Sequence, residues 1–518
     1  MVGLFTWSVA LFYLPGAGFS YMIEFGELEH QRYLPELKAA THYEMPNSPG
    51  YDSQWYAQIA MHPRLTDPVL RKAVDSLPYR ARRILFEWTA WVLGGGNPAR
   101  VMNVYALQNV ACWYLLALLL LRWLPPVSWG NVFRWGAVLF SFGLIFSVRG
   151  ALLDGPSLLL VSVGMVLIEG GRLWAGALVM GVSGLGKDTN ILCGAALPPA
   201  DPRNARTWAP WIGRGILLVL PLLLWIAYIR LRLGHADDIG ARNFARPFAG
   251  LMNKLEDTTS SLMAEHYPYD SVAKFNLLVV VGLLAQFFFF AFRIRWRDPW
   301  WRVGASYAIL MMFLGDAVWE NYPSAAARVL VPMTLAFNLR VPRRGWWPLL
   351  LLLGNLGVFG AADLLKPPGR ESFMVKGPMA LRMSAATQKL VEVEYGQSNW
   401  WMPEKSHWGW QYFRWSMGDS TVTVHNPQAF AIAADVTFSL RAVDRRAAIV
   451  SVGGREAWRG MLEPAEVREV TLPGVVLAPG DTVFGFRSDR PAAFPGHGDI
   501  RKLTFSVRDL EFDLRERR

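Results

Sequence analysis

Long apolar blocks separated by short polar stretches fill the first 365 residues of the chain. Blocks such as Ala111–Leu121, Gly215–Tyr228 and Phe275–Phe292 contain no charged residue. With their flanks, several approach the ~20 residues that an α-helix needs to cross a bilayer core. We therefore expect an α-helical polytopic membrane domain over residues 1–365, with apolar spans near residues 4–23, 98–121, 132–148, 155–169, 173–186, 188–200, 211–230, 274–292, 303–318, 324–339 and 346–363. The fifth and sixth are short and alternatively form one broken or re-entrant pair, which gives about 10 or 11 spans.

The pattern changes after residue 365. The stretch "KPPGR" predicts a linker, and residues 366–418 also contain a tryptophan-rich segment with Trp400, Trp401, Trp408, Trp410 and Trp415. We expect these rings to lie at the membrane interface or in a protein core, with stacking on sugars as the alternative. From about Asp419, short stretches such as "STVTVHN" and "TVFGFRS" alternate between apolar and polar residues. This period of two predicts an all-β sandwich or jelly roll over residues 419–518.

Composition and charge agree with a membrane protein and predict its orientation. Hydrophobic residues make up 53% of the chain and charged residues 18%, and the net charge is +11. Basic residues collect in every second loop if residues 173–200 cross the membrane twice, which makes the N-terminus cytoplasmic. The large first loop, residues 24–97, and the β-domain then lie on the extracytoplasmic side. No Lys or Arg precedes Arg32, so Met1–Ile23 is expected to be an uncleaved first span.

The first loop contains a polar and aromatic stretch, "GYDSQWYAQIAMHP", at Gly50–Pro63. A Pro-Gly pair precedes it, so we expect a helix to begin at Asp52. Helical spacing places Asp52 and Tyr56 on one face and Tyr51, Trp55 and Ile59 on a neighbouring one. From these residues alone, Asp52 caps the helix or complements its dipole.

The same stretch resembles the first external loop of bacterial GT-C glycosyltransferases, in particular mannosyltransferase-like members. Their pattern is Tyr-Asp-Gly-Gln-aromatic-Tyr-x-x-Ile-Ala-x-x-Pro, followed by Tyr-Arg-x-x-Arg-Ile. The matching residues are Tyr51, Asp52, Gln54, Trp55, Tyr56, Ile59, Ala60, Pro63, Tyr79, Arg80, Arg83 and Ile84. Ser53 departs from the pattern, which has Gly there. The stretch "GLGKDTN" resembles the Lys-Glu-Thr element of the same proteins, with Asp188 in place of Glu.

The resemblance implies a polytopic enzyme of the bacterial cytoplasmic (inner) membrane. Its donor would be a polyprenyl-phosphate-linked sugar, and its acceptor a glycan or lipid on the extracytoplasmic face. In this family an acidic residue of the first external loop deprotonates or orients the acceptor hydroxyl. Asp52 is the matching residue and our candidate catalytic base, provided that it lies within hydrogen-bond reach of the acceptor. Glu44 is a rival in the same loop, together with Glu24, Glu27 and Glu29.

A lipid phosphate also requires cationic contacts near the membrane surface. The candidate substrate-binding residues are Glu44, Gln54, Tyr56, Arg80, Arg82, Arg83, Arg149, Asp154, Lys187, Asp188 and Arg328. The three arginines of the first loop alternatively extend to lipid headgroups. Ionisable residues at membrane depth are costly unless paired or functional, and Lys187 with Asp188 alternatively forms a structural ion pair.

Two further classes of ligand are weighed from the same residues. Some superfamily members use a divalent metal, but no acidic pair lies in a matching motif, so the cofactor stays unassigned. No basic stripe with base-stacking aromatic residues is present, so nucleic acid is not expected as a partner.

The alternative function is a non-catalytic transporter or assembly scaffold for lipid-linked glycan. A helix break near Gly184–Thr189 agrees with a transporter, whereas no internal repeat is visible in the sequence.

Overall fold

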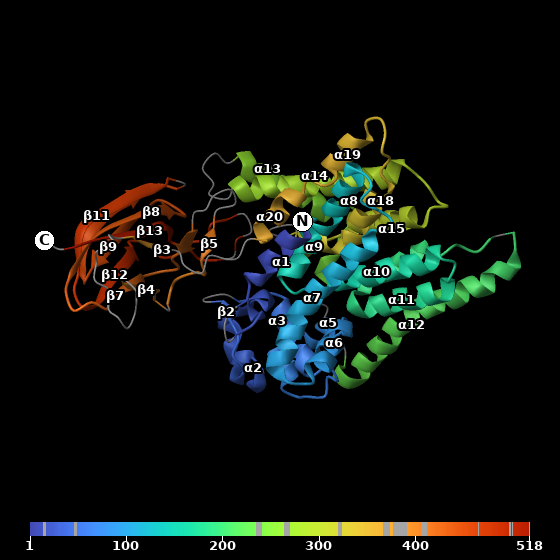
Figure 1. Ribbon diagram of the computed structural model, residues 1–518, viewed down its shortest axis with the longest axis horizontal. Coiled ribbons are helices and arrows are strands. Elements are labelled where there is room, and N and C mark those ends of the chain that lie inside the picture. Colours follow the sequence, from blue (N-terminus) through green and yellow to red (C-terminus); the bar gives the residue numbers. More distant parts are fainter. Residues whose placement is uncertain are drawn as a thin grey trace. The chain divides into compact units, whose positions relative to one another are not determined.

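The computed structural model describes residues 1–13, 17–45, 49–201, 203–234, 241–263, 270–319, 324–365, 373–376, 391–396, 398–405, 412–464, 466–496, 499 and 501–516. The chain divides into two compact units. Unit 1 comprises Met1–Glu44, Gly50–Thr259 and Ala273–Pro367, and unit 2 comprises Met45–Pro49, Ser260–Val272 and Pro368–Arg518. Helices dominate the first and strands the second (Figure 1).

Helices of very unequal length make up the first 365 residues (Figure 1). The α-helices are α1 (Val2–Ala10), α2 (Pro35–Ala39), α3 (Ser53–Met61), α4 (Leu70–Ala73), α5 (Leu77–Arg80), α6 (Leu85–Gly94), α7 (Pro98–Leu120), α8 (Trp129–Leu139), α9 (Phe142–Arg149), α10 (Asp154–Glu169), α11 (Leu173–Gly186), α12 (Trp208–Leu233), α13 (Ala249–Met263), α14 (Asp270–Phe292), α15 (Pro299–Phe313), α16 (Asp316–Trp319), α17 (Ser324–Val329), α18 (Val331–Arg340), α19 (Trp347–Leu353) and α20 (Val358–Leu364). Short 3₁₀ helices include η1 (Ser20–Ile23), η2 (Glu27–Arg32) and η3 (Asp188–Ala196), and a two-stranded sheet joins β1 (Phe25–Gly26) to β2 (Glu44–Met45).

Among the described residues, three helices are long and apolar enough to cross a membrane, namely α7, α12 and α14. Helices α8 and α9 make a fourth candidate if they form one span, bent by 46°. Large apolar side chains of α12, such as Leu223 and Leu224, are 56% and 62% exposed. Such a surface suits lipid better than water. The helical, membrane-type character is therefore confirmed, whereas the number of spans and their orientation stay predictions.

Two of the predicted spans differ from single helices. In the segment 4–23, α1 ends at Ala10, and η1 is buried in protein. The sequence supplies a reason, because a proline and two glycines interrupt this segment, and Gly18 has a φ of +61°. In the segment 188–200, the chain forms the nine-residue 3₁₀ helix η3 directly after α11. Whether residues 173–200 cross the membrane twice or form one broken or re-entrant pair stays a prediction.

The first loop is itself a folded layer of short helices. Every residue of α3 is buried, from Ser53 to Met61. Helix α3 packs against α6 and α7, and α6 also packs against α11. Local signals set the ends of these elements: the Asn97 side chain accepts from the Arg100 N–H at 3.1 Å, where Pro98 opens α7. Gly95, with a φ of +61°, ends α6. The outcome is a rigid platform that carries the motif residues of the first loop.

The C-terminal unit is a sandwich of two β-sheets. Its strands are β3 (Phe373–Lys376), β4 (Glu392–Tyr395), β5 (Glu404–Lys405), β6 (Tyr412–Trp415), β7 (Ser420–Asn426), β8 (Ile432–Ala442), β9 (Arg446–Val452), β10 (Arg455–Leu462), β11 (Arg468–Leu477), β12 (Gly480–Ser488) and β13 (Phe505–Glu516). One sheet has the order β10-β9-β12-β7-β4 and the other β11-β8-β13-β6-β5, while β3 runs parallel to β13. Residues alternate between buried and half-buried along β8. Phe486 of the first sheet and Phe438 of the second meet in one core, which confirms the predicted all-β domain.

The segment 366–418, which the sequence assigns to a linker, contributes strands β3 to β6 to this sandwich. Two of its tryptophans belong to protein cores: Trp400 is 1% exposed and Trp415 is 2% exposed. The Trp400 indole N–H donates to the Thr421 carbonyl at 2.7 Å. Stacking on sugars is therefore excluded for these two rings. The stretch "KPPGR", Trp408 and Trp410 lie outside the described residues.

Candidate functional site

A tight turn in front of α3 presents Asp52. Gly50 has a φ of +73°, and a Cβ added there would lie 2.6 Å from the Glu24 carbonyl oxygen, so the position requires glycine. The Tyr51 N–H donates to the same carbonyl at 3.0 Å. The Ser53 hydroxyl donates to the Ile23 carbonyl at 2.5 Å. Ser53, where the chain departs from the family pattern, thus anchors this turn.

Asp52 forms an ion pair with an arginine of the same layer. The carboxylate occupies the N-cap position of α3, but among the described residues it accepts no capping hydrogen bond. Its Oδ1 lies 2.9 Å from Nη2 of Arg80, the last residue of α5, and the side chain is 36% exposed. The same nitrogen lies 2.7 Å from Oδ2 of Asp75. Asp52 therefore stands at the N-cap without a capping hydrogen bond among the described residues, and it shares one guanidinium with Asp75.

Opposing effects act on the Asp52 carboxyl. Burial raises its pKa, but the positive charges of Arg80, Arg328 and Arg83 outweigh burial and hold the pKa below its ordinary value. Asp52 is consequently ionised at neutral pH. In this state it can accept a proton or a hydrogen bond, although three cations make it a weak base.

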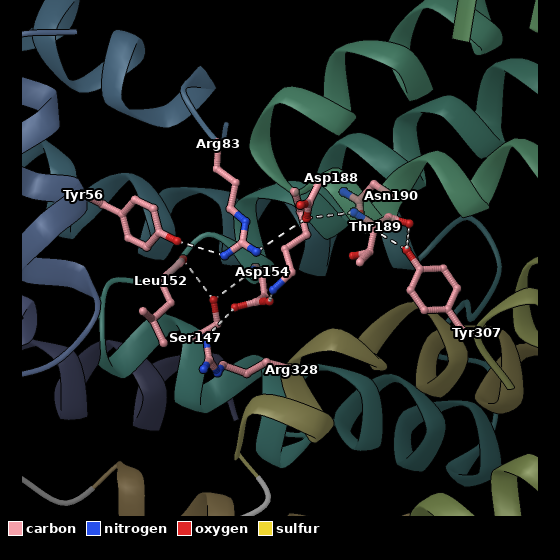
Figure 2. Close-up of polar contacts among 12 residues, drawn as sticks. Tyr56, Arg83, Ser147, Leu152, Asp154, Asp188, Thr189, Asn190, Tyr307 and Arg328 are labelled. Carbon is pink, nitrogen blue, oxygen red and sulfur yellow. Dashed lines mark hydrogen bonds and ion pairs between the residues drawn. The ribbon is translucent and has the colours of Figure 1, made fainter. Parts of the chain in front are cut away.

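A second group of contacts centres on Arg83, between α5 and α6. Its Nη1 donates to the Tyr56 hydroxyl at 2.9 Å, and its Nη2 lies 3.5 Å from Oδ1 of Asp188. Figure 2 shows Tyr56 and Asp188 on opposite sides of this guanidinium. The Arg80 guanidinium lies 5.5 Å from the centre of the Tyr56 ring, which connects the Arg83 group to Asp52.

A third group centres on Asp154, the first residue of α10. One oxygen of this nearly buried carboxylate contacts Nζ of Lys187, and the other lies 3.2 Å from Nη1 of Arg328 on α17. Arg328 Nη2 in turn donates to the Tyr51 hydroxyl at 3.3 Å, next to Asp52. Lys187 is followed in the chain by Asp188, so the Asp154 group and the Arg83 group are connected (Figure 2). The contact of Arg80 with the Tyr56 ring joins Asp52 to them, and the three groups form one network.

Neutral hydrogen bonds fix the backbone that carries this network. The Ser147 hydroxyl donates to the Leu152 carbonyl at 3.0 Å and accepts from the Gly155 N–H at 2.9 Å, which braces the turn between α9 and α10. On the other side, the Tyr307 hydroxyl on α15 donates to the Thr189 carbonyl at 3.0 Å. Figure 2 shows both braces flanking Asp154 and Asp188. Charged side chains held in this way cost little further ordering when a ligand binds.

The structure brings most of the predicted site residues into this network and gives the rest other partners. The members of the network are Asp52, Tyr56, Arg80, Arg83, Asp154, Lys187, Asp188 and Arg328. Glu44 contacts His30 and His42, at 2.7 and 2.8 Å. Gln54 Oε1 accepts from the Tyr33 hydroxyl at 2.7 Å. Arg149 pairs with Glu24, and Arg82 lies over the Tyr79 ring.

Three contributors were not predicted from the sequence. Tyr51 stands in the motif, but no pattern showed that its hydroxyl meets Arg328. Asp75 lies five residues before Arg80, and this spacing is the one available signal for their pair. Glu87 on α6 is wholly buried without a described partner, although it looks like any helical glutamate in the sequence.

The network offers cations to an anionic ligand and carboxylates to a hydroxyl, but no evident metal site. In the part of the chain that the structure describes, no group of three His, Cys, Asp or Glu residues is placed to hold a metal ion. Asp52, Asp154 and Asp188 each face a cation instead. Such an arrangement suits phosphate binding next to proton transfer.

Comparisons with known proteins give little beyond this geometry. No family model matches the chain, and no curated protein matches it. Among solved structures, the chain is similar to the cryo-EM structure of the arabinosyltransferase EmbB from Mycobacterium smegmatis, with 11% sequence identity and a TM-score of 0.26. The match covers 98% of this chain and 64% of EmbB, so the chain spans less than two thirds of that protein's length.

Proposed function

We propose that this protein is a membrane glycosyltransferase of the GT-C type. It moves a sugar from a polyprenyl-phosphate carrier to a glycan or lipid acceptor on the extracytoplasmic face. The observation that carries the proposal is the network itself: an ionised Asp52 lies beside Arg80, and the charges of Arg83 and Arg328 act on the same carboxylate. Lys187 belongs to the same network through Asp154. Charged side chains at this density in a mostly apolar chain are costly unless they serve a ligand or one another.

In the proposed reaction, the acceptor hydroxyl oxygen attacks the anomeric carbon of the donor sugar. The bond between that carbon and the phosphate oxygen breaks, and the phosphate leaves with the electron pair. Asp52 takes the hydroxyl proton, and the arginines stabilise the negative charge on the departing phosphate. Guanidinium groups suit this role because they bind two phosphate oxygens at once.

Binding of the donor phosphate is expected to change the pKa of Asp52, which is low before substrate binds. Arg80, Arg328 and Arg83 hold the pKa of Asp52 down against the effect of burial. A phosphate among these arginines takes up part of their positive charge. The arginines then lower the pKa of Asp52 less, so this pKa rises toward the ordinary range and Asp52 becomes a better proton acceptor.

Sugar transfer by the purified protein in liposomes tests this function. The assay uses a panel of polyprenyl-phosphate sugars with a native glycan extract as acceptor, and compares wild type with Asp52→Asn and Asp75→Asn. Both variants remove a carboxylate that contacts the same Arg80 nitrogen, and Asp75, which also accepts from Arg80 Nε at 3.0 Å, makes the more extensive of the two contacts. We expect Asp52→Asn to lose about 10²–10⁴-fold in rate, the usual contribution of a general base, and Asp75→Asn to lose less than about tenfold. Equal rates in wild type and Asp52→Asn would remove Asp52 as the base.

A transporter of lipid-linked glycan is the second candidate, favoured by one observation. Helix α11 ends at Gly186, and the chain continues as η3 next to Lys187 and Asp188. Discontinuous helices of this kind form substrate sites in transporters. If wild type transfers no sugar from any donor but moves a fluorescent prenyl-phosphate glycan across the liposome bilayer, the transporter replaces the enzyme.

A further inference from the structure

A buried carboxyl group lies behind the Arg83 part of the network. Glu87, in the first turn of α6, is wholly buried, and neither of its carboxyl oxygens has a hydrogen-bond partner among the described residues. Within the same described part of the chain, two neighbouring polar atoms are also buried without partners: Nε of Arg83 and the hydroxyl oxygen of Tyr105. These atoms come from three successive segments, the turn before α6, α6 itself and α7.

The charged and titratable groups around Glu87 come from every helix packed against α6. Helix α3 carries Tyr56 and follows Asp52 at its N-cap, α7 carries Tyr105, and the end of α11 leads into Lys187 and Asp188. Arg80 ends α5, just before α6 in the chain. The cation that acts directly on the Glu87 carboxyl is Arg83, four residues before it. Arg83 is already bound to Tyr56 and Asp188, so it leaves Glu87 without an ion pair.

Burial without a partner decides the charge of this carboxyl. A carboxylate that is removed from water and receives no hydrogen bond costs many kcal/mol, and such a group takes up a proton instead. Consistently, burial raises the pKa of the Glu87 carboxyl well above its usual range, although Arg83 and backbone N–H groups act in the opposite direction. Glu87 is therefore an uncharged acid at neutral pH.

We propose that the uncharged state of Glu87 leaves the positive charge of Arg83 to an anionic ligand, and that ionised Glu87 would offset this charge and weaken binding. Glu87 is thus a positioning residue that acts through Arg83. The anion is of the phosphate class, because Arg83, Arg80 and Arg328 offer the paired donors that phosphate oxygens accept. The proposal rests on the proposed function in one respect: the phosphate is taken to be that of a prenyl-phosphate donor.

The charge of Glu87 can be measured without any ligand. A protonated carboxyl gives its own infrared band, so the difference spectrum between wild type and Glu87→Gln isolates the band of this residue. Glutamine matches the size of glutamate and is neutral at every pH, which keeps the variant folded. We expect the protonated band in wild type at pH 7.5. Its absence at this pH would overturn the proposal, whatever the protein's activity.

Binding of farnesyl phosphate between pH 7.5 and 9.5 tests the coupling to Arg83, with farnesol as the probe that lacks phosphate. We expect Glu87→Gln to bind as wild type does at pH 7.5. At higher pH, we expect wild-type affinity to fall only where the protonated band disappears, by about tenfold once Glu87 is ionised. Glu87→Gln should keep its affinity over the same range. Glu36→Gln, which removes a half-exposed carboxyl of the first loop, should follow wild type.

Three results contradict the proposal: weaker binding by Glu87→Gln at pH 7.5, loss of the band without loss of affinity, and loss of affinity without loss of the band. If wild type binds farnesol as tightly as farnesyl phosphate while the band is present, the anion site fails and the phosphate donor fails with it. If farnesyl phosphate binds but its affinity ignores Glu87, only the coupling fails. The two proposals are thereby separated.

Discussion

Two carboxylates, one in each unit, contact an arginine, yet their pKa values shift in opposite directions. In the helical unit, burial raises the pKa of Asp52, but three arginines overcome this effect and lower it. In the β-sandwich, burial raises the pKa of Glu404, and Arg501 together with Arg508 only partly offsets the rise. Glu404 is the less exposed side chain, at 23% against 36% for Asp52.

The number of cations around each carboxylate explains the difference. Arg501 lies 2.5 Å from Glu404 but also 2.7 Å from Asp499, whose negative charge raises the pKa of Glu404 further. Asp52 likewise shares Arg80 with Asp75, but it has Arg328 and Arg83 in addition. A single ion pair therefore does not reveal whether a site is built around charge. The number of cations that act on one carboxylate, here called the surplus of cations, is three at Asp52 against two at Glu404, and it distinguishes the proposed phosphate site from this structural pair.

The largest loss of stability is expected where two cations contact the most deeply buried carboxylate of the network. Asp154 is 3% exposed at its side chain and neutralises both Lys187 and Arg328, so Asp154→Asn leaves two buried cations without a counter-ion. Breaking a buried pair in this way costs about 3–5 kcal/mol of the free energy of unfolding. Denaturant titration in detergent micelles measures this loss.

The control for Asp154 is Asp257→Asn in the same unit, where the lost carboxylate is 43% exposed and pairs with Lys254. The double variant Asp154→Asn with Lys187→Met should recover part of the lost stability, because it removes one of the two unpaired charges. A loss below about 1 kcal/mol in the single variant would show that water reaches this site and that the surplus of cations carries no cost.

The elements that the sequence predicted well are those with a strong local pattern. Apolar blocks predicted the helical membrane-type region, and alternation in stretches such as Ser420–Asn426 predicted the sandwich. The short predicted spans were less certain, because a block of about 15 apolar residues can cross a bilayer or pack inside the protein. Residues 188–200 show this, since they form a 3₁₀ helix braced by Tyr307.

For the site, the motif located residues but not their partners. It pointed to Asp52, Arg80 and Arg83, which do lie together, yet the same stretch supplied Gln54, which instead anchors the Tyr33 hydroxyl. Pairs such as Arg328 with Asp154 join positions 174 residues apart. Only the packing of α10 near α17 creates them, and no local pattern encodes it. Burial without a partner, as at Glu87, is equally invisible in a sequence.

The next largest effect concerns the cation that Glu404 and Asp499 share. Arg501→Met removes the partner of both carboxylates, but Glu404 can take up a proton because burial already raises its pKa. We therefore expect a loss of about 1–3 kcal/mol, the cost of an unsatisfied group, rather than the cost of an unpaired charge. Calorimetry of the intact protein, with hydrogen exchange to assign the transition of the sandwich, measures it. Lys502→Met, whose ammonium lies over the Phe494 ring, is the neighbouring control. A loss as large as that in Asp154→Asn would contradict the comparison.

The opposite pKa shifts predict opposite pH dependences. The lowered pKa of Asp52 means that its ionised form stabilises the protein above pH ~4 and that this contribution is lost on acidification. The free energy of unfolding of wild type should exceed that of Asp52→Asn by less than about 1 kcal/mol at pH 7, because the side chain is partly exposed. This difference should shrink as the pH falls to 3. The raised pKa of Glu404 has the reverse sign, because its contribution is present below pH ~4.3 and is lost as pH rises. Relative to wild type, Glu404→Gln should therefore gain stability from pH 4 to pH 7. Melting curves across this range check both signs, and parallel slopes for the two variants would refute the explanation by cation number.

The smallest effect is expected for an ion pair of equally good geometry on the surface of the sandwich. Arg459 contacts both oxygens of Glu456, at 2.9 and 2.7 Å, and the side chains are 57% and 47% exposed. Hydrogen bonding to Arg459 lowers the pKa of Glu456, but water solvates both charges after either partner is removed. Glu456→Gln should leave the melting temperature unchanged within error at any salt concentration, whereas Asp52→Asn should lower it most at low salt. A clear loss of stability in Glu456→Gln would mean that contact geometry, and not burial with a surplus of cations, sets the energetic value of these pairs. The network around Asp52 would then lose its distinction from an ordinary surface pair.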